Sequence, residues 1–193
     1  KINSKKKNKV ENIIFDWFLE GFHLCNYQFS RHKTKPEKKI FKIKSEFKSA
    51  FNEFSVEANY IARDLVNEPL SHLTALQLSK TIRKLGKEAG FKVKVLDEKK
   101  IKSLKMGGVL SVNRGSIRKP TFNILTYQPR QAINKNPYVL VGKGVMYDTG
   151  GLSLKPTPNS MDMMKCDMAG AASVIGAIYA LAKSKSNQYV VGL

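Results

Sequence analysis

One stretch of the sequence, residues 138–172, concentrates the side chains that can do chemistry. Lys143 stands between two glycines at the end of a valine-rich apolar run. An ammonium group in that position is costly to bury without a partner. Asp148, Lys155 and Asp167 follow, and small residues after Asp167 begin a helical pattern. Apolar strand, glycine-rich turn, charged side chains and helix start together indicate a segment that builds a site.

The residue types alone leave the kind of site open. Lys143 can bind a phosphate or form a structural salt bridge, although Gly142-Lys-Gly144 lacks the spacing of a P-loop. Asp148-Thr-Gly resembles the motif of aspartic proteases, whose acid works as one of a carboxylate pair, but the sequence holds no second motif of this kind. A helix N-cap is sufficient to explain Asp167.

Positive charge dominates the composition. The formal net charge is +19, from 34 basic and 15 acidic side chains. Such an excess of positive charge is typical of proteins that bind nucleic acid or an anionic membrane. The charge is nearly all lysine and is spread along the chain, whereas arginine is the preferred reader of bases and phosphates. We expect a solvated lysine surface that adsorbs polyanions at low salt, with nucleic-acid binding as the alternative.

The sequence signals for disulfides, histidine metal sites and membrane spans are weak. Cys25 and Cys166 form neither a disulfide framework nor a zinc ribbon, which favours two free thiols in a reducing compartment. His23, His32 and His72 have no metal-ligand spacing, so we expect ordinary surface histidines. No apolar run reaches the roughly 18 residues of a membrane span, so we predict no membrane partner.

The elements that must position the site follow from hydrophobic periodicity. Helices and strands alternate with short connections, which predicts an α/β layered fold. Helices are expected at Val10–Leu24, Phe47–Leu65, Ser71–Gly90 (with Thr74 as N-cap), Asp97–Leu104 and Met168–Lys183. Strands are expected at Lys39–Lys44 (an edge strand), Phe91–Leu96, Val109–Val112, Thr121–Tyr127, Tyr138–Val141 (buried) and Tyr189–Leu193 (buried).

Two motifs make a specific family resemblance. Val141-Gly-Lys-Gly-Val-Met-Tyr-Asp-Thr-Gly-Gly-Leu-Ser-Leu-Lys-Pro156 and Met161-Asp-Met-Met-Lys-Cys-Asp-Met-Ala-Gly-Ala-Ala172 resemble the active-site segment of the leucyl aminopeptidase family. The stretches 62–69 and 106–112 are also similar to that family. The resemblance runs from about Phe15 to the end and is densest from Asn59 onward. It implies a cytosolic metallo-exopeptidase with a two-metal centre.

The resemblance implies a role for each matching residue. Lys143, Asp148 and Asp167 match metal ligands, with Lys143 binding as a neutral amine and Asp148 bridging both metals. Oxygen ligands with one nitrogen suit two divalent ions, zinc or manganese, with magnesium as a further option. Lys155 matches the catalytic lysine that polarises the scissile carbonyl. Met164 matches a residue of the pocket for the substrate's N-terminal side chain, where a flexible thioether suits several apolar residues.

The same resemblance implies the architecture, substrates and assembly. It predicts a three-layer α/β/α catalytic domain around a mixed, largely parallel sheet. Residues 1–45 would end a smaller N-terminal domain, residues 46–68 would form a connecting helix, and residues 69–193 would begin the catalytic domain. The expected substrates are short peptides with a free, apolar N-terminal residue, cleaved by a metal-activated water. The expected assembly is a cytoplasmic homo-hexamer.

The sequence departs from the family pattern in three ways. One extra residue lies within Thr157–Ser160, and Cys166 and Ala169 replace the more usual alanine and glycine. The family also uses a later Asn-Thr-Asp-Ala-Glu-Gly-Arg segment, with two more metal carboxylates, which the 193 residues do not contain. We therefore expect a piece of a longer enzyme that is inactive alone, or a non-catalytic relative that binds polyanions.

Overall fold

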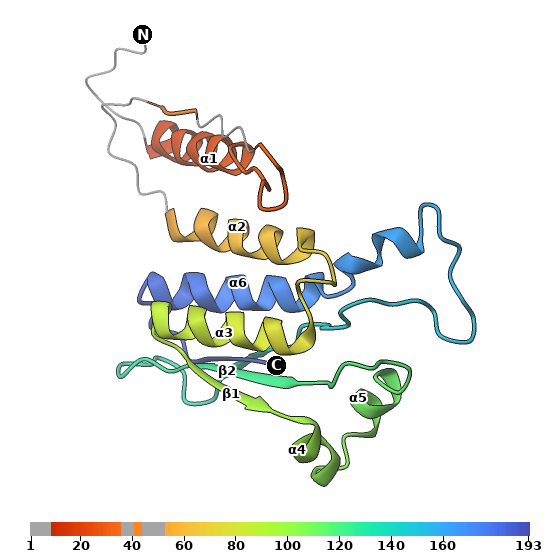
Figure 1. The fold of residues 1–193 in the computed structure, drawn as a ribbon. Helices are drawn as coiled ribbons and strands as arrows, with labels where there is room; N and C mark the ends of the chain where they lie inside the picture. The colour runs from red at the N-terminus through yellow and green to blue at the C-terminus, as the bar shows by residue number, and fades with distance from the viewer. Residues whose placement is uncertain (1–8, 36–40, 44–52) are drawn as a thin grey trace.

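The computed structural model describes residues 9–35, 41–43 and 53–193. Helices alternate with strands along most of the chain, as the periodicity predicts (Figure 1). The helices are α1 Lys9–Cys25, α2 Glu53–Asn67, α3 Ala75–Ala89, α4 Glu98–Ser103, α5 Gly107–Val112, a 3-10 helix η1 Met161–Cys166, and α6 Ala169–Lys183. The strands are β1 Lys92–Leu96, β2 Phe122–Tyr127, β3 Tyr138–Leu140 and β4 Val190–Gly192.

The four strands form one mixed sheet in the order β1-β2-β4-β3. β2 pairs antiparallel with β1 and β4, and β3 pairs parallel with β4. The predicted mixed α/β fold is confirmed, although among these strands only one pairing in three is parallel. Because β3 and α6 precede β4 in the chain, α6 is the crossover that returns the chain to a parallel neighbour.

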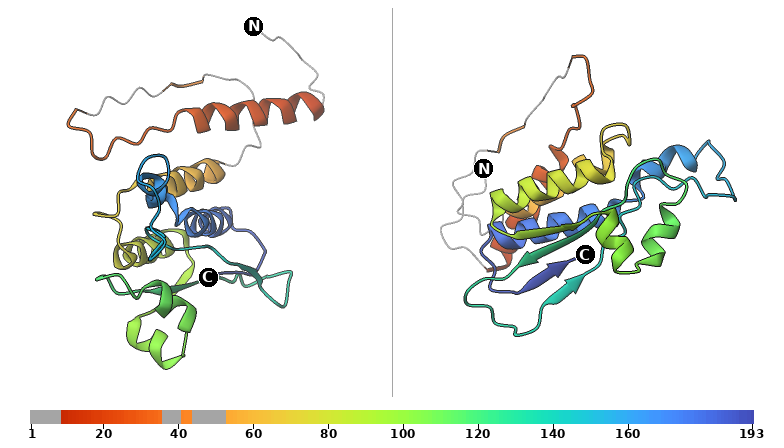
Figure 2. Two further views of the ribbon diagram at one scale, coloured as in Figure 1. Left: turned by 90° about the vertical axis from the view of Figure 1, so that its right-hand side faces the viewer. Right: turned by 60° about the horizontal axis from the view of Figure 1, so that its bottom comes forward.

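The long helices stack over one face of the sheet. α3 and α6 lie next to the strands, α2 packs on α6, and α1 lies outside α2, while α4 and α5 lie on the far side of β1 (Figures 1 and 2). The core fills the space between these layers. Its fully buried side chains include Ile82, Met168, Ile175, Ile178 and Tyr179.

Capping residues fix the ends of α3 as the sequence predicts. The Thr74 side chain accepts a hydrogen bond from the backbone N–H of Gln77, which satisfies one of the free donors at the helix start. At the other end Gly90 adopts φ 89°, a left-handed conformation that closes the helix. Within α3, a side chain at Gly86 would collide with Val93 and Phe91, so glycine lets β1 fold back closely against the helix.

Three predictions of strand or burial need correction. Residues 109–112, predicted as a strand, form part of α5, because a segment of four residues is too short to carry a periodicity that separates strand from helix. The strand at 138–140 is present but not buried. Tyr138 and Val139 are 59% and 52% exposed, because β3 lies at an edge of the described sheet. Of the strand expected at Lys39–Lys44, only residues 41–43 are described, and they are irregular.

The first two predicted helices are present where the structure describes them. Residues 47–52 lie outside the described chain, and α2 covers the rest of its predicted range. α1 forms as predicted. The described residues do not cover its apolar face. Trp17 and Phe18 are 69% and 59% exposed, and Ile13 and Ile14 are also exposed.

α6 is the central helix of the core. Together with η1 it forms a helical stretch, Met161–Lys183, that is long and apolar enough to cross a membrane by length and composition alone. Its packing gives another reason for this apolarity, since α6 contacts α2, α3, β2 and β4. A side chain at Gly176 would approach the carbonyl oxygen of Ala58 to 3.0 Å, so this glycine permits the close contact with α2.

One buried hydroxyl joins three helices. The Tyr179 side chain of α6 is fully buried, and its hydroxyl lies 2.7 Å from Oε1 of Glu57 on α2 and 2.7 Å from Oε1 of Glu88 on α3. Burial, followed by the two carboxylates, raises the pKa of Tyr179, so the hydroxyl keeps its proton.

We predict that Tyr179→Phe lowers the free energy of unfolding by about 1–3 kcal/mol, because it leaves two neighbouring carboxylates without their shared donor. Urea unfolding of the purified protein measures this change. Tyr138→Phe is the matched control, since Tyr138 is exposed, and we expect no measurable change. Equal stability of the Tyr179→Phe variant and the parent would contradict the assigned role.

Candidate active site

The site begins where the chain leaves β3 and contacts the start of α6. The backbone N–H of Ala171 donates to the carbonyl of Lys143 over 3.0 Å. A Cβ atom at Gly142 would lie 2.7 Å from both the Cα of Ala171 and the carbonyl oxygen of Gly170. A Cβ atom at Gly170 would lie 2.8 Å from the backbone nitrogen of Lys143. The glycines and small residues that mark this region in the sequence therefore allow two backbones to touch.

This contact brings Lys143 and Asp167 together. The Lys143 Nζ atom lies 2.8 Å from Oδ1 of Asp167, just before α6. Asp167, through its hydrogen bond and its charge, raises the pKa of Lys143, and Asp148 adds to this while partial desolvation opposes it. Lys143 is thus held as an ammonium ion in this state.

Asp148 and Lys155 form a second ion pair on the same loop. The Lys155 Nζ atom lies 3.1 Å from Oδ2 of Asp148, and the backbone N–H of Gly150 donates to Oδ1 over 2.9 Å. The Gly150 hydrogen bond first, and Lys155 second, lower the pKa of Asp148, so it stays a carboxylate. Gly150 has φ 86°, and a side chain there would collide with the carbonyl of Ser153. Only glycine suits this tight turn.

Met164 touches the second pair from η1. Its Sδ atom lies 3.3 Å from Nζ of Lys155, whose side chain is 28% exposed. The Tyr147 hydroxyl donates to the carbonyl of Met161 over 2.7 Å and so ties the loop to η1. Residues 157–160 are the segment in which the sequence predicts an extra residue. The two residues that flank this segment are joined by a hydrogen bond from the N–H of Met161 to the carbonyl of Pro156.

The five residues predicted for the site therefore fall into two neighbouring groups. Lys143 and Asp167 form one pair, and Asp148, Lys155 and Met164 form the other group. The two groups are linked electrostatically, since Lys143 and Asp148 each shift the pKa of the other. The sequence prediction placed all five in one segment, and the structure keeps them together.

The donor atoms suit a divalent cation. Oδ2 of Asp167 is buried and has no hydrogen-bond partner among the described residues. An unsatisfied buried carboxylate oxygen is costly, and a bound cation would satisfy it. Two carboxylates and one amine match the preference of zinc, manganese or magnesium for oxygen and nitrogen ligands.

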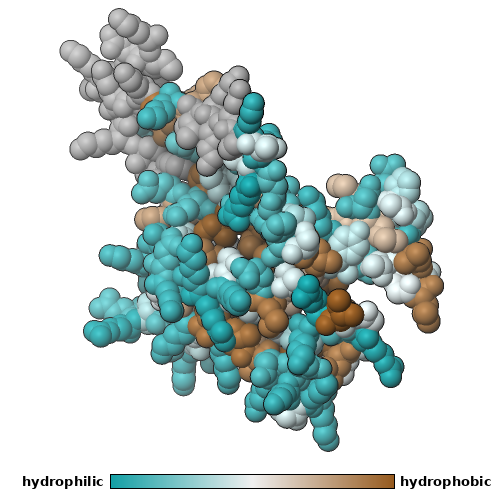
Figure 3. Space-filling model, viewed as in Figure 1, coloured by the Kyte–Doolittle hydropathy of each residue, from teal (hydrophilic) through white to brown (hydrophobic). Residues whose placement is uncertain are grey.

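A mostly apolar cavity of about 470 Å³ lies beside the Lys143 loop. Gly142, Met146 and Ala171 contribute to its walls, together with residues of α3, α5 and β2. Met164, predicted to line the substrate pocket, is not among its lining residues. Further along the same loop Leu152 and Leu154 are exposed, and Figure 3 shows hydrophobic side chains on this projecting segment.

Comparison with known proteins decides the family. The sequence pattern of the cytosol aminopeptidase family, catalytic domain, matches residues 60–193, more than half of the chain. The chain belongs to the cytosol aminopeptidase family. The matched residues contain α3, the whole sheet and both groups of the site, together with most of α2.

Curated members of the family are similar over two thirds or more of the chain. A probable cytosol aminopeptidase of Chloroherpeton thalassium is 39% identical over 98% of this chain and 42% of its own length. One from Chlorobaculum tepidum is 53% identical over 68% of this chain and 26% of its own. The chain thus spans about two fifths, or less, of the length of these cytosol aminopeptidases.

Solved structures give the same result. The cytosol aminopeptidase of Coxiella burnetii has a TM-score of 0.78 and 27% identity, over 92% of this chain and 38% of the other. The bottromycin maturation enzyme BotP in complex with Mn has a TM-score of 0.77 and 34% identity, again over 92% of this chain and 38% of the other. The mixed α/β architecture is therefore that of the cytosol aminopeptidase family.

We predict that Gly142→Ala lowers the free energy of unfolding by about 1–3 kcal/mol, because the new Cβ overlaps the backbone at the start of α6. Urea unfolding measures the change. Gly144→Ala is the matched control, because its Cβ would lie 3.7 Å from the nearest neighbouring side chain, an ordinary contact. Equal effects of the two substitutions would show that the close approach at Gly142 does not constrain the fold.

Proposed function

We propose that this chain forms part of a metal-dependent aminopeptidase that removes apolar N-terminal residues, such as leucine, from short peptides. One observation carries the proposal. Two lysine–carboxylate pairs, Lys143–Asp167 and Asp148–Lys155, lie together where β3 ends and α6 begins. Membership of the cytosol aminopeptidase family supports the reaction class.

Lys143, Asp148 and Asp167 would hold the metals, with two divalent ions in each subunit. Zinc and manganese are the leading candidates, and magnesium is a further one. The structural relative BotP is in complex with Mn, which supports a divalent ion. Such ions, when bound, lower the pKa of a coordinated water and polarise the peptide carbonyl. Lys143 would have to lose its proton before its amine could act as a ligand.

The remaining residues of the site would act on the peptide. Lys155 would donate hydrogen bonds to the scissile carbonyl oxygen and stabilise the negative charge that develops there. Its ion pair with Asp148 holds the ammonium group in place. Met164, in contact with Lys155, would present a flexible apolar surface to the substrate's first side chain.

The proposal includes the rest of the enzyme. Residues 1–45 would close an N-terminal domain, residues 46–68 would connect it, and residues 69–193 would begin the catalytic domain. Two further carboxylates from a later segment would complete the metal centre, and an arginine of that segment would lie near the reacting water. The whole enzyme would be a cytoplasmic homo-hexamer, a location that agrees with the names of the relatives.

We predict that Lys155→Ala lowers kcat for leucine amide by about 10²–10³-fold in the full-length enzyme with added Mn²⁺, the usual cost of removing one donor to an oxyanion. Steady-state kinetics measures it. Lys135→Ala, at an exposed position outside the site, is the control and should keep the parent rate. Hydrolysis that survives both a chelator and Lys155→Ala would contradict the proposed mechanism.

A further inference from the structure

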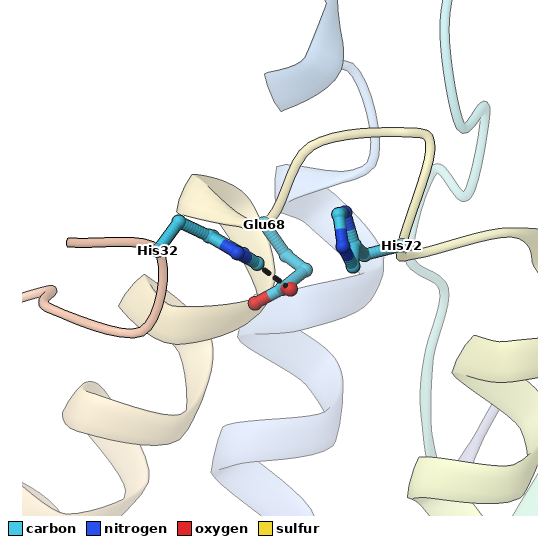
Figure 4. A group of neighbouring side chains, drawn as sticks. All are labelled: His32, Glu68 and His72. Carbon is cyan, nitrogen blue, oxygen red and sulfur yellow. Dashed lines mark hydrogen bonds and ion pairs between the residues drawn. The ribbon is translucent and has the colours of Figure 1, made fainter. Parts of the chain in front are cut away.

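Two histidines and a glutamate meet at a place that sequence spacing did not indicate. His32 lies in the turn after α1, Glu68 directly follows α2, and His72 lies in the turn before α3. The three side chains point toward one another (Figure 4). The His32 Nε2 atom lies 2.8 Å from Oε1 of Glu68, and the rings of His32 and His72 are 4.6 Å apart, centroid to centroid.

The spacing of these groups is close to that of metal ligands. One potential ligand atom from each residue lies within 4.8 Å of the other two. Tetrahedral ligands with bonds of about 2.0–2.2 Å stand about 3.3–3.6 Å apart, so small side-chain rotations are sufficient to form a site. The Ser71 hydroxyl, 3.1 Å from Nδ1 of His72, can orient that ring, as outer hydrogen bonds do for ligating histidines.

The charges nearby permit a cation. Glu68 is only 11% exposed, so its carboxylate is held in a defined place. Arg31 lies 3.4 Å from Oε2 of Glu68 but only 2.7 Å from Oδ2 of Asp64. Asp64 is thus the closer partner of Arg31, and Oε1 of Glu68 faces His32 instead. Neutral imidazoles and one carboxylate form a donor set that suits zinc and neighbouring transition metals.

We propose that His32, Glu68 and His72 bind one divalent transition-metal ion, with zinc the favoured metal and a water as the fourth ligand. The site shares no residue with the Lys143–Asp167 and Asp148–Lys155 pairs and does not depend on the proposed peptidase activity. The ion would join the turn after α1 to the connection between α2 and α3. It would thereby clamp the segment before residue 60 to the family's catalytic domain.

Cobalt titration of the protein, followed by the visible absorption of four-coordinate Co²⁺, tests this site. An Asp167→Asn background weakens the candidate active site and so separates the two centres. We expect one equivalent of Co²⁺ with a four-coordinate spectrum, which Zn²⁺ displaces. His32→Ala and His72→Ala should each remove this spectrum and weaken Zn²⁺ binding more than about tenfold, and Glu68→Gln should weaken it similarly.

His23→Ala is the matched control, because His23 lies outside the three-residue group, and it should keep the spectrum and the affinity. Two different histidine variants guard against the misfolding of one, and circular dichroism checks that each is folded. Unchanged Co²⁺ spectra and Zn²⁺ affinity in both folded variants would overturn the site. So would the absence of any four-coordinate Co²⁺ signal in the background protein. Neither result would bear on the peptidase proposal.

Discussion

The close contact between the Lys143 loop and the start of α6 is the constraint on which the candidate site depends. Gly142 and Gly170 leave no room for side chains, so the two backbones touch and Ala171 donates to the carbonyl of Lys143. That contact sets Lys143 beside Asp167, although 24 residues separate them in the chain. Positioning by backbone packing is more rigid than positioning by flexible side chains alone.

The core holds this contact in place. α6 is buried against α2 and the sheet, and Tyr179 fixes it to α2 and α3 through Glu57 and Glu88. β3 and β4 pair in parallel, which fixes where the loop leaves the sheet. The fold thus places one loop and one helix start side by side, and the chemistry of the site belongs to their few charged residues.

Much of this arrangement could be predicted from the sequence, because its signals are local. Caps at Thr74 and Gly90 gave the ends of α3, and strict alternation gave β1. The candidate site residues are predicted from two motifs rather than from periodicity. The ion pairs between these residues were not predicted. Whether Lys143 contacts Asp167, and Asp148 contacts Lys155, depends on how the loop folds.

The predictions that were wrong or missing also have physical causes. Val109–Val112 has no pattern that distinguishes a strand from a helix, and it forms part of α5. The exposure of β3 depends on which strands are its neighbours, which no local pattern encodes. His32 and Glu68 meet across 36 residues because the turn after α1 packs beside the end of α2. The spacing of motifs in the sequence carries no information about such a contact.

The metal-binding role of Lys143 and Asp167 is tested most directly by a crystal structure of the full-length enzyme with saturating Mn²⁺, with the metal located by its anomalous scattering. We expect a peak within about 2.0–2.3 Å of Nζ of Lys143 and Oδ2 of Asp167, with the direct ion pair between them broken. An intact Lys143–Asp167 ion pair, with no anomalous peak beside either residue, would contradict it.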